Sequence, residues 1–195
     1  MNKLLYNLII IFIFLILNIY SLFFSATYYF KYIKLIFSVL FVIGYFSYLI
    51  IFQKQIIYSI KNINNNNKYI LYWISYLIYC ISYLLFFIIQ ILNKKYIKIG
   101  LYSSILFLIS SILFMYSTFN KKYILQFISN DKNLLFYGGV AFTFTSIFLI
   151  IAFLKNNKKY FIYATLLLII GRSIFLIDSY MKYKDSHKAD FLIKE

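Results

Sequence analysis

The sequence predicts an all-α fold, a transmembrane bundle of about six helices. Hydrophobic residues make up 64% of the chain and charged residues 13%, whereas a soluble domain is roughly half apolar and a quarter charged. The charged residues gather in short clusters between apolar runs. Lipid offers the backbone no hydrogen-bond partners, and the runs lack the alternation of barrel strands, so we expect each run to be helical.

Each predicted span is a run of about 20 mostly apolar residues, enough for a helix to cross a hydrocarbon core roughly 30 Å thick. The first run directly follows Lys3. It is long for a signal peptide and has no convincing cleavage site, so we interpret it as an uncleaved helix. The expected spans are residues 4–24, 33–52, 69–92, 99–119, 134–154 and 160–180, all within one domain that covers residues 1–195.

An even number of spans places both termini on the same side of the membrane. The positive-inside rule favours cytoplasmic termini by a small margin of lysines. We therefore expect an integral, multi-pass protein of a bacterial inner membrane or its equivalent. Near the C-terminus, Phe191, Leu192 and Ile193 begin an apolar run with no continuation, so the tail is expected to be interfacial or frayed.

The net charge of +15 does not indicate a nucleic-acid partner. The lysines lie at the ends of the apolar runs, where they reach lipid headgroups, and an AT-rich codon bias is an equally good source of the excess. Cys80 is the only cysteine and His187 the only histidine, which excludes an intramolecular disulfide and the His-rich zinc motifs. We predict no metal site and no cofactor, and the oligomeric state is left open.

Small and hydroxyl residues inside the spans are typical of close helix packing. The fourth and fifth spans each carry such a set at helical spacing. They are Ser103, Ser104, Ser110 and Ser111 in the fourth span, and Gly138, Ala141 and Thr145 in the fifth. We interpret both sets as packing surfaces, and a substrate site is the alternative.

Arg172 lies near the middle of the sixth span, where a guanidinium costs roughly 2.5–3.5 kcal/mol on insertion scales. It should therefore face the bundle interior and find a partner, either an anion such as a lipid phosphate or hydroxyl groups of Ser and Tyr. A purely structural tie between helices is the alternative. Asp178 is the only acidic residue in any span, but it is six positions away, turned from the face of Arg172 and near the membrane boundary.

Several pieces of the chain recur in order in a known family. They are Tyr32-Ile33-Lys34-Leu35, the stretch from Cys80 to Leu85, the stretch from Phe107 to Phe114, and Thr165 to Leu168 followed by Gly171-Arg172-Ser173, with the best match over Tyr163 to Ile193. In these pieces the chain resembles the YhhN family of multi-pass proteins, which includes lysoplasmalogenases. Two departures are clear. The family's membrane aspartates would fall on Tyr83 and Arg172 and its histidine on Ser111, and a span is missing between the fourth and fifth.

The resemblance implies hydrolysis of the vinyl-ether bond of lysoplasmalogens, a reaction suited to carboxylic acids. Tyr83 and Arg172 are poor replacements for such acids, so the resemblance implies a divergent member whose chemistry is lost or rebuilt. The catalytic residues are unknown, and whether the chain is an enzyme is left open.

We hypothesise that Arg172, Tyr83 and Ser111 converge on one interior pocket and bind the substrate. The partners would be membrane lipids, in particular a lysophospholipid. No two carboxylates and no histidine lie at membrane depth, which favours binding over catalysis. A non-enzymatic multi-pass scaffold or small transporter is the alternative.

Overall fold

The computed structural model describes residues 3–24, 36, 39, 43, 67–91, 97–119 and 134–192. These residues contain long helices and no strand, so the all-α prediction is confirmed for this part of the chain. Most of the expected second span, residues 33–52, lies outside it. The helices are α1 (Lys3–Phe24), α3 (Asn67–Ile91), α4 (Ile97–Thr118), α5 (Leu134–Lys155) and α6 (Lys158–Leu192).

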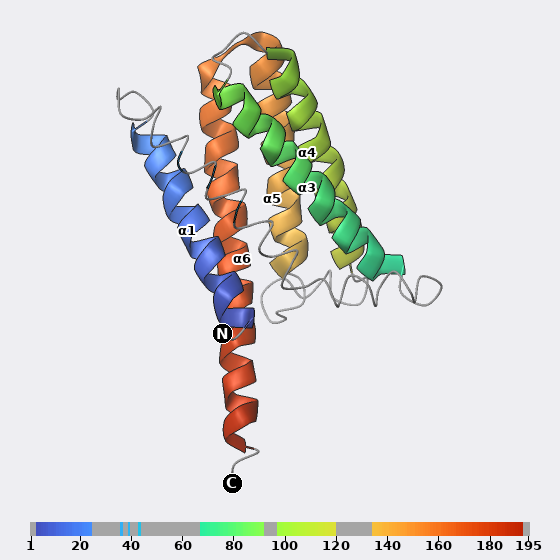
Figure 1. The fold of residues 1–195 in the computed structure, drawn as a ribbon, viewed down its shortest axis with the longest axis vertical. Helices are drawn as coiled ribbons and strands as arrows, with labels where there is room; N and C mark the ends of the chain where they lie inside the picture. Colours follow the sequence, from blue (N-terminus) through green and yellow to red (C-terminus); the bar gives the residue numbers. More distant parts are fainter. Residues whose placement is uncertain are drawn as a thin grey trace.

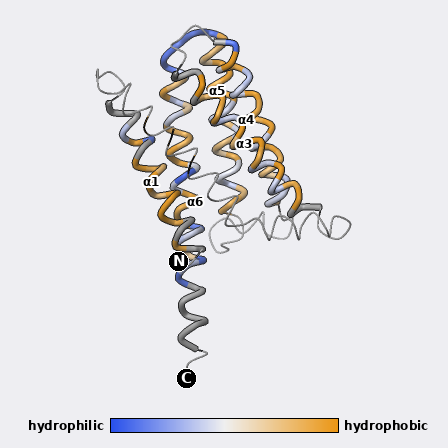
Figure 2. Tube along the Cα trace, viewed as in Figure 1, coloured by the Kyte–Doolittle hydropathy of each residue, from blue (hydrophilic) through white to orange (hydrophobic). Residues whose placement is uncertain are grey.

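Three of these helices are long and apolar enough to cross a membrane. The spanning segments are Lys98–Thr118 in α4, Leu134–Lys155 in α5 and Lys158–Lys184 in α6. Hydrophobic residues dominate the bundle, and a hydrophilic stretch marks the turn between α5 and α6 (Figure 2). Many large apolar side chains on the helices are exposed, as lipid-facing surfaces require and as a soluble protein of this size would avoid. The chain is therefore an α-helical membrane protein.

The helices pack in a fixed spatial order that differs from their order in the sequence. α1 contacts α6, α6 contacts α5, α5 contacts α4, and α4 contacts α3, so the N-terminal helix lies beside the C-terminal one (Figure 1). The beginning of α1 and the C-terminal part of α6 lie towards the same end of the bundle (Figure 1). α6 has 35 residues, and its C-terminal part extends beyond the other helices (Figure 1). The tail was expected to be interfacial or frayed; Phe191 and Leu192 are helical, Ile193 lies outside the described residues, and an interfacial position stays a prediction.

Serine hydroxyls connect α3 to α4. The hydroxyl of Ser82 donates to the carbonyl oxygen of Ser103 at 2.9 Å, and the hydroxyl of Ser103 donates to the carbonyl oxygen of Ser82 at 2.7 Å. One heptad away, the hydroxyl of Ser110 donates to the carbonyl oxygen of Ser75 at 2.7 Å. The pairing shows that the two helices run antiparallel. It also supports the packing interpretation of Ser103 and Ser110, because hydroxyls bonding across an interface hold membrane helices together.

The turn between α5 and α6 is set by two asparagines. Asn156 adopts a positive φ of 47°, the left-handed conformation in which Asn and Gly end helices. The backbone N–H of Asn157 donates to the carbonyl oxygen of Ala152 at 3.2 Å, and the side-chain oxygen of Asn157 accepts from the backbone N–H of Lys159 at 2.9 Å. The same residue thus caps the end of α5 and the start of α6.

α5 and α6 approach closely at Gly171. A Cβ atom added there would lie 2.6 Å from the ring of Phe142 and 3.3 Å from the Cβ of Ala141. The small residues let Phe142 join Phe14, Tyr79 and Phe107 in a buried aromatic core. Arg172 follows Gly171 directly, so this contact also fixes the depth at which the arginine enters the bundle.

Candidate functional site

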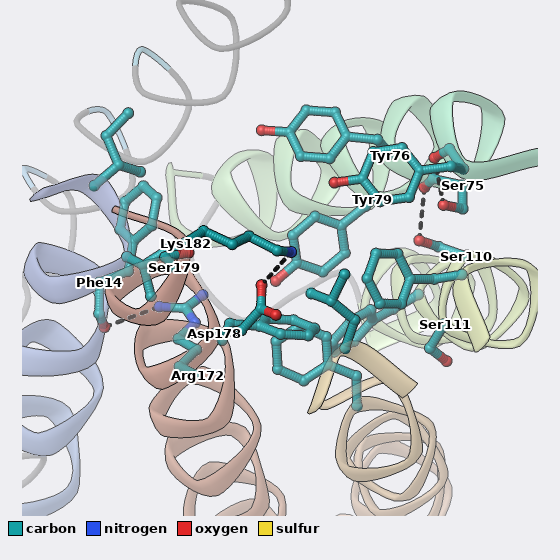
Figure 3. Close-up of a pocket in the computed structure, with 18 residues that line it drawn as sticks. Phe14, Ser75, Tyr76, Tyr79, Ser110, Ser111, Arg172, Asp178, Ser179 and Lys182 are labelled. Atoms are coloured by element: carbon teal, nitrogen blue, oxygen red, sulfur yellow. Dashed lines mark hydrogen bonds and ion pairs between the residues drawn. The ribbon is translucent and has the colours of Figure 1, made fainter. Parts of the chain in front are cut away.

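Arg172 is buried in the middle of the α6 span, with 4% of its surface exposed. One guanidinium nitrogen donates to the backbone carbonyl oxygen of Phe14 in α1 at 2.9 Å, as Figure 3 shows. The guanidinium carbon also lies 5.2 Å from the centre of the Phe14 ring, within the range of a cation–π contact. These contacts compensate for the loss of hydration that burial imposes on the charge.

Tyr83 supplies a second contact to the same guanidinium. Its hydroxyl accepts a hydrogen bond from Arg172 at 3.0 Å, and its ring packs edge-on against Tyr79 with the centroids 4.7 Å apart. The sequence expectation that a tyrosine hydroxyl would meet the arginine agrees with this geometry. Arg172 therefore joins α6 to α1 and to α3, two helices that are far apart in the sequence.

Ser111 lies elsewhere. Its hydroxyl donates to the carbonyl oxygen of Leu108 in its own helix at 2.9 Å and accepts a bond from the Thr143 hydroxyl at 3.2 Å. It lines the same pocket as Arg172 but on the opposite side (Figure 3). The structure thus brings Arg172 and Tyr83 into contact and does not bring Ser111 to them; the substrate-binding role of all three stays a prediction.

A pocket of about 270 Å³ lies between the helices and is lined by residues from α1, α3, α4, α5 and α6. Its walls are mainly aromatic, and its polar groups come from tyrosines, serines and three charged residues. Tyr83 contacts Arg172 but does not line the pocket. The aromatic lining consists of Phe14, Tyr72, Tyr76, Tyr79, Phe107, Phe114, Phe142 and Phe175.

The charged residues of the lining are Arg172, Asp178 and Lys182, all from α6. The ammonium group of Lys182 contacts a carboxylate oxygen of Asp178 at 2.7 Å. The carboxylate side chain is only 5% exposed, whereas the lysine side chain is 51% exposed. Figure 3 shows the lysine side chain extending over the pocket towards the carboxylate. Asp178 was expected to turn away from the face of Arg172, yet both line one pocket, because the lining covers a wide sector of α6.

Sequence reasoning missed several groups of this site. The ion pair had a usable signal, because Asp178 and Lys182 are four residues apart on a helix. No sequence signal pointed to Tyr76 and Tyr79, because the chain contains 22 tyrosines and the positions of these two do not distinguish them from the others. No sequence signal pointed to the carbonyl oxygen of Phe14 either, since every residue has a backbone carbonyl group.

We compared the chain with protein-family models, with curated proteins and with solved structures, and no significant match was found. The fold and the pocket define an α-helical membrane protein with a partly charged, aromatic-lined pocket inside its bundle.

Proposed function

We propose that the chain is a multi-pass membrane protein that binds a single-chain phospholipid, of the lysophospholipid type, in this pocket. The observation that carries the proposal is the pocket itself, which combines aromatic walls with Arg172, Asp178 and Lys182 inside a membrane bundle. An ionisable residue at membrane depth, as Arg172 is, is costly to place there and is by default the sign of a functional site. An amphiphile can contact the aromatic residues of such a lining with its apolar chain and the charged residues with its headgroup.

The size of the pocket favours a single-chain ligand. Pockets for small ligands usually measure about 300–1,000 Å³, and this one, at about 270 Å³, is slightly smaller than that range. It has room for a headgroup and part of one chain. The rest of the chain would then contact the apolar surroundings of the bundle.

The depth of the charged residues fits a headgroup that enters from the membrane boundary. Lys182 follows Arg172 by ten positions, which corresponds to about 15 Å along a helix axis. Half of the hydrocarbon core is also about 15 Å thick. With Arg172 near the middle of the span Lys158–Lys184, Lys182 lies near the boundary. The beginning of α1 and the C-terminal part of α6 lie towards the same end of the bundle (Figure 1), which supports termini on one side of the membrane; we propose that this is the cytoplasmic side of a bacterial inner membrane or its equivalent.

Hydrolysis of a lysoplasmalogen vinyl ether, the activity implied by the resemblance to the YhhN family, is a narrower proposal for the same pocket. Protonation of the enol ether needs an acid. Asp178 is the one carboxyl group among the described residues of the lining, and its carboxylate already contacts the ammonium group of Lys182. The geometry therefore supports binding better than hydrolysis. If the protein released fatty aldehyde from a lysoplasmalogen and the Asp178→Asn variant did not, hydrolysis would be better supported than binding alone.

A structural role is the second candidate, and the bonds of Arg172 to Phe14 and Tyr83 favour it. In a scaffold, the guanidinium would hold three helices together and the pocket would have no specific ligand. The two candidates differ in one respect, because only the first requires the protein to retain a lipid during purification.

The test is native mass spectrometry of the full chain purified in a mild, uncharged detergent, followed by identification of the lipids that co-purify. Ser110 lines the pocket, and its hydroxyl bonds to the carbonyl oxygen of Ser75. Ser110→Leu loses this bond and fills the pocket, whereas the matched control Ser110→Ala loses the bond and leaves the pocket open. We expect a single-chain lipid on the wild type and on Ser110→Ala and its loss from Ser110→Leu. Equal lipid content in all three proteins would contradict a lipid-binding pocket.

A further inference from the structure

The charges of the pocket lining do not cancel. Among the described residues that line it, Arg172 and Lys182 carry positive charge and Asp178 carries negative charge. The sum of their formal charges is +1, whichever of the two cations is paired with the carboxylate. The charge of Arg172, which is only 4% exposed, is poorly screened by water or salt, whereas the half-exposed Lys182 is screened more strongly.

We infer that the pocket selects a single-chain amphiphile whose headgroup carries net negative charge, over zwitterionic and cationic amphiphiles with the same chain. This inference rests on the proposed lipid-binding function and adds the sign of the headgroup. An anionic head brings the charge of the occupied pocket to zero or near it. A zwitterionic head leaves the sum at +1, and a cationic head raises it to +2.

Lys182 is the group best placed to contact an incoming anion. Its ammonium has three N–H donors, of which the bond to Asp178 uses one. Its side chain is half exposed, while the Asp178 side chain is buried. The flexible lysine stem can therefore move with the ligand, and the carboxylate stays at the wall and holds the ammonium at the pocket.

Arg172 contributes from deeper in the same pocket. Its bonds to the carbonyl oxygen of Phe14 and to the hydroxyl of Tyr83 fix the guanidinium in place. A fixed cation acts on the ligand through its field without having to leave its partners. The anionic head is thus attracted along the pocket by one mobile cation near the boundary and one fixed cation further in.

The experiment compares three probes with the same chain: dodecyl phosphate, dodecylphosphocholine and dodecyltrimethylammonium. Each is titrated against the full-length protein in zwitterionic-lipid nanodiscs, and binding is read by displacement of a brominated single-chain lipid that quenches Trp73, the only tryptophan. Trp73 packs against Tyr72 and Tyr76, which line the pocket. Inorganic phosphate is included as a competitor without a chain.

Two variants change the formal charge of the lining in known steps, and a third leaves it unchanged. Lys182→Gln sets it to zero, and Asp178→Asn raises it to +2 with little change in shape. Lys184→Gln removes an equal charge from an exposed position of the same helix that does not line the pocket, and it is the matched control. Asp178→Asn also shows whether the result depends on the intact ion pair.

We expect the wild type to prefer dodecyl phosphate to dodecylphosphocholine by about tenfold, because the two headgroups differ in net charge and one net charge close to the cations of the pocket has an effect of this order. The preference should fall towards one in Lys182→Gln, rise in Asp178→Asn and stay unchanged in Lys184→Gln. Equal binding of all three probes would overturn the inference and leave the lipid pocket standing, whereas no displacement by any probe would refute the pocket itself. Displacement by inorganic phosphate at the same concentration as dodecyl phosphate would show that the site takes a free anion, which also overturns the inference.

Discussion

The hydrogen bond between Arg172 and Tyr83 gives a direct test of how the buried charge is accommodated. Tyr83→Phe removes the hydroxyl that accepts from the guanidinium at 3.0 Å and keeps the ring that packs against Tyr79. Hydrogen bonds between membrane helices are worth about 0.6 kcal/mol on average and at most about 1.7 kcal/mol, and bonds to charged groups in soluble proteins about 1.5–3 kcal/mol. Because Arg172 is only 4% exposed, we expect a loss of about 1–2 kcal/mol in the free energy of unfolding.

The assay is reversible unfolding in mixed micelles, followed by the fluorescence of the buried Trp73. Tyr116→Phe is the matched control, because Tyr116 is 63% exposed, and it should change stability by less than about 0.5 kcal/mol. In an Arg172→Leu background, Tyr83→Phe should leave the free energy of unfolding almost unchanged. The double-mutant cycle should then give a coupling free energy of about 1 kcal/mol between the two residues. Equal effects of Tyr83→Phe in both backgrounds would refute the reasoning.

Three further predictions follow from the fold. Replacing both Ser82 and Ser103 by Ala removes the reciprocal bonds between α3 and α4 and should lower the free energy of unfolding by about 1–3 kcal/mol; no loss would mean that apolar packing alone holds the pair. Asn156→Gly should keep or raise the melting temperature, and Asn156→Val should lower stability by about 1–2 kcal/mol because of the positive φ; a tolerated valine would contradict the turn. Reporters fused after Lys3 and at Lys188 should lie on the same side of the membrane, and opposite sides would refute the even number of spans.

The helical fold was predictable because lipid constrains the backbone strongly. Each helix must satisfy its own hydrogen bonds, so length and apolar content are sufficient to locate it. Residues 134–154 were expected as a span, and α5 covers Leu134–Lys155. The spatial order of the helices was not predictable in the same way, because apolar faces carry little information about which neighbour they meet. Arg172 contributes a hydrogen bond between α6 and α1, and its acceptor is a carbonyl oxygen 158 positions away in the sequence.

The candidate site was predictable only where a residue was unusual for its surroundings. Arg172 is a mid-membrane charge, so the need for polar partners was predictable. Tyr83 and Ser111 were both chosen from the family resemblance and from their hydroxyl groups. The Tyr83 hydroxyl accepts from Arg172, whereas the Ser111 hydroxyl bonds within α4 and to α5. The pairing of Asp178 with Lys182 was missed because the lysine lies beyond the expected span of residues 160–180, while α6 continues to Leu192.

The most direct test of a lipid-binding pocket is to map where a lipid reacts. A single-chain phospholipid with a photoactivatable diazirine on its chain would be crosslinked to the full-length protein in nanodiscs, and the adducts located by peptide mass spectrometry. We predict adducts on pocket-lining residues such as Tyr76, Tyr79 and Phe107, suppressed by an excess of unlabelled lipid of the same kind. Adducts confined to outward-facing residues such as Tyr102 and Tyr116, unaffected by competitor, would contradict a lipid-binding pocket.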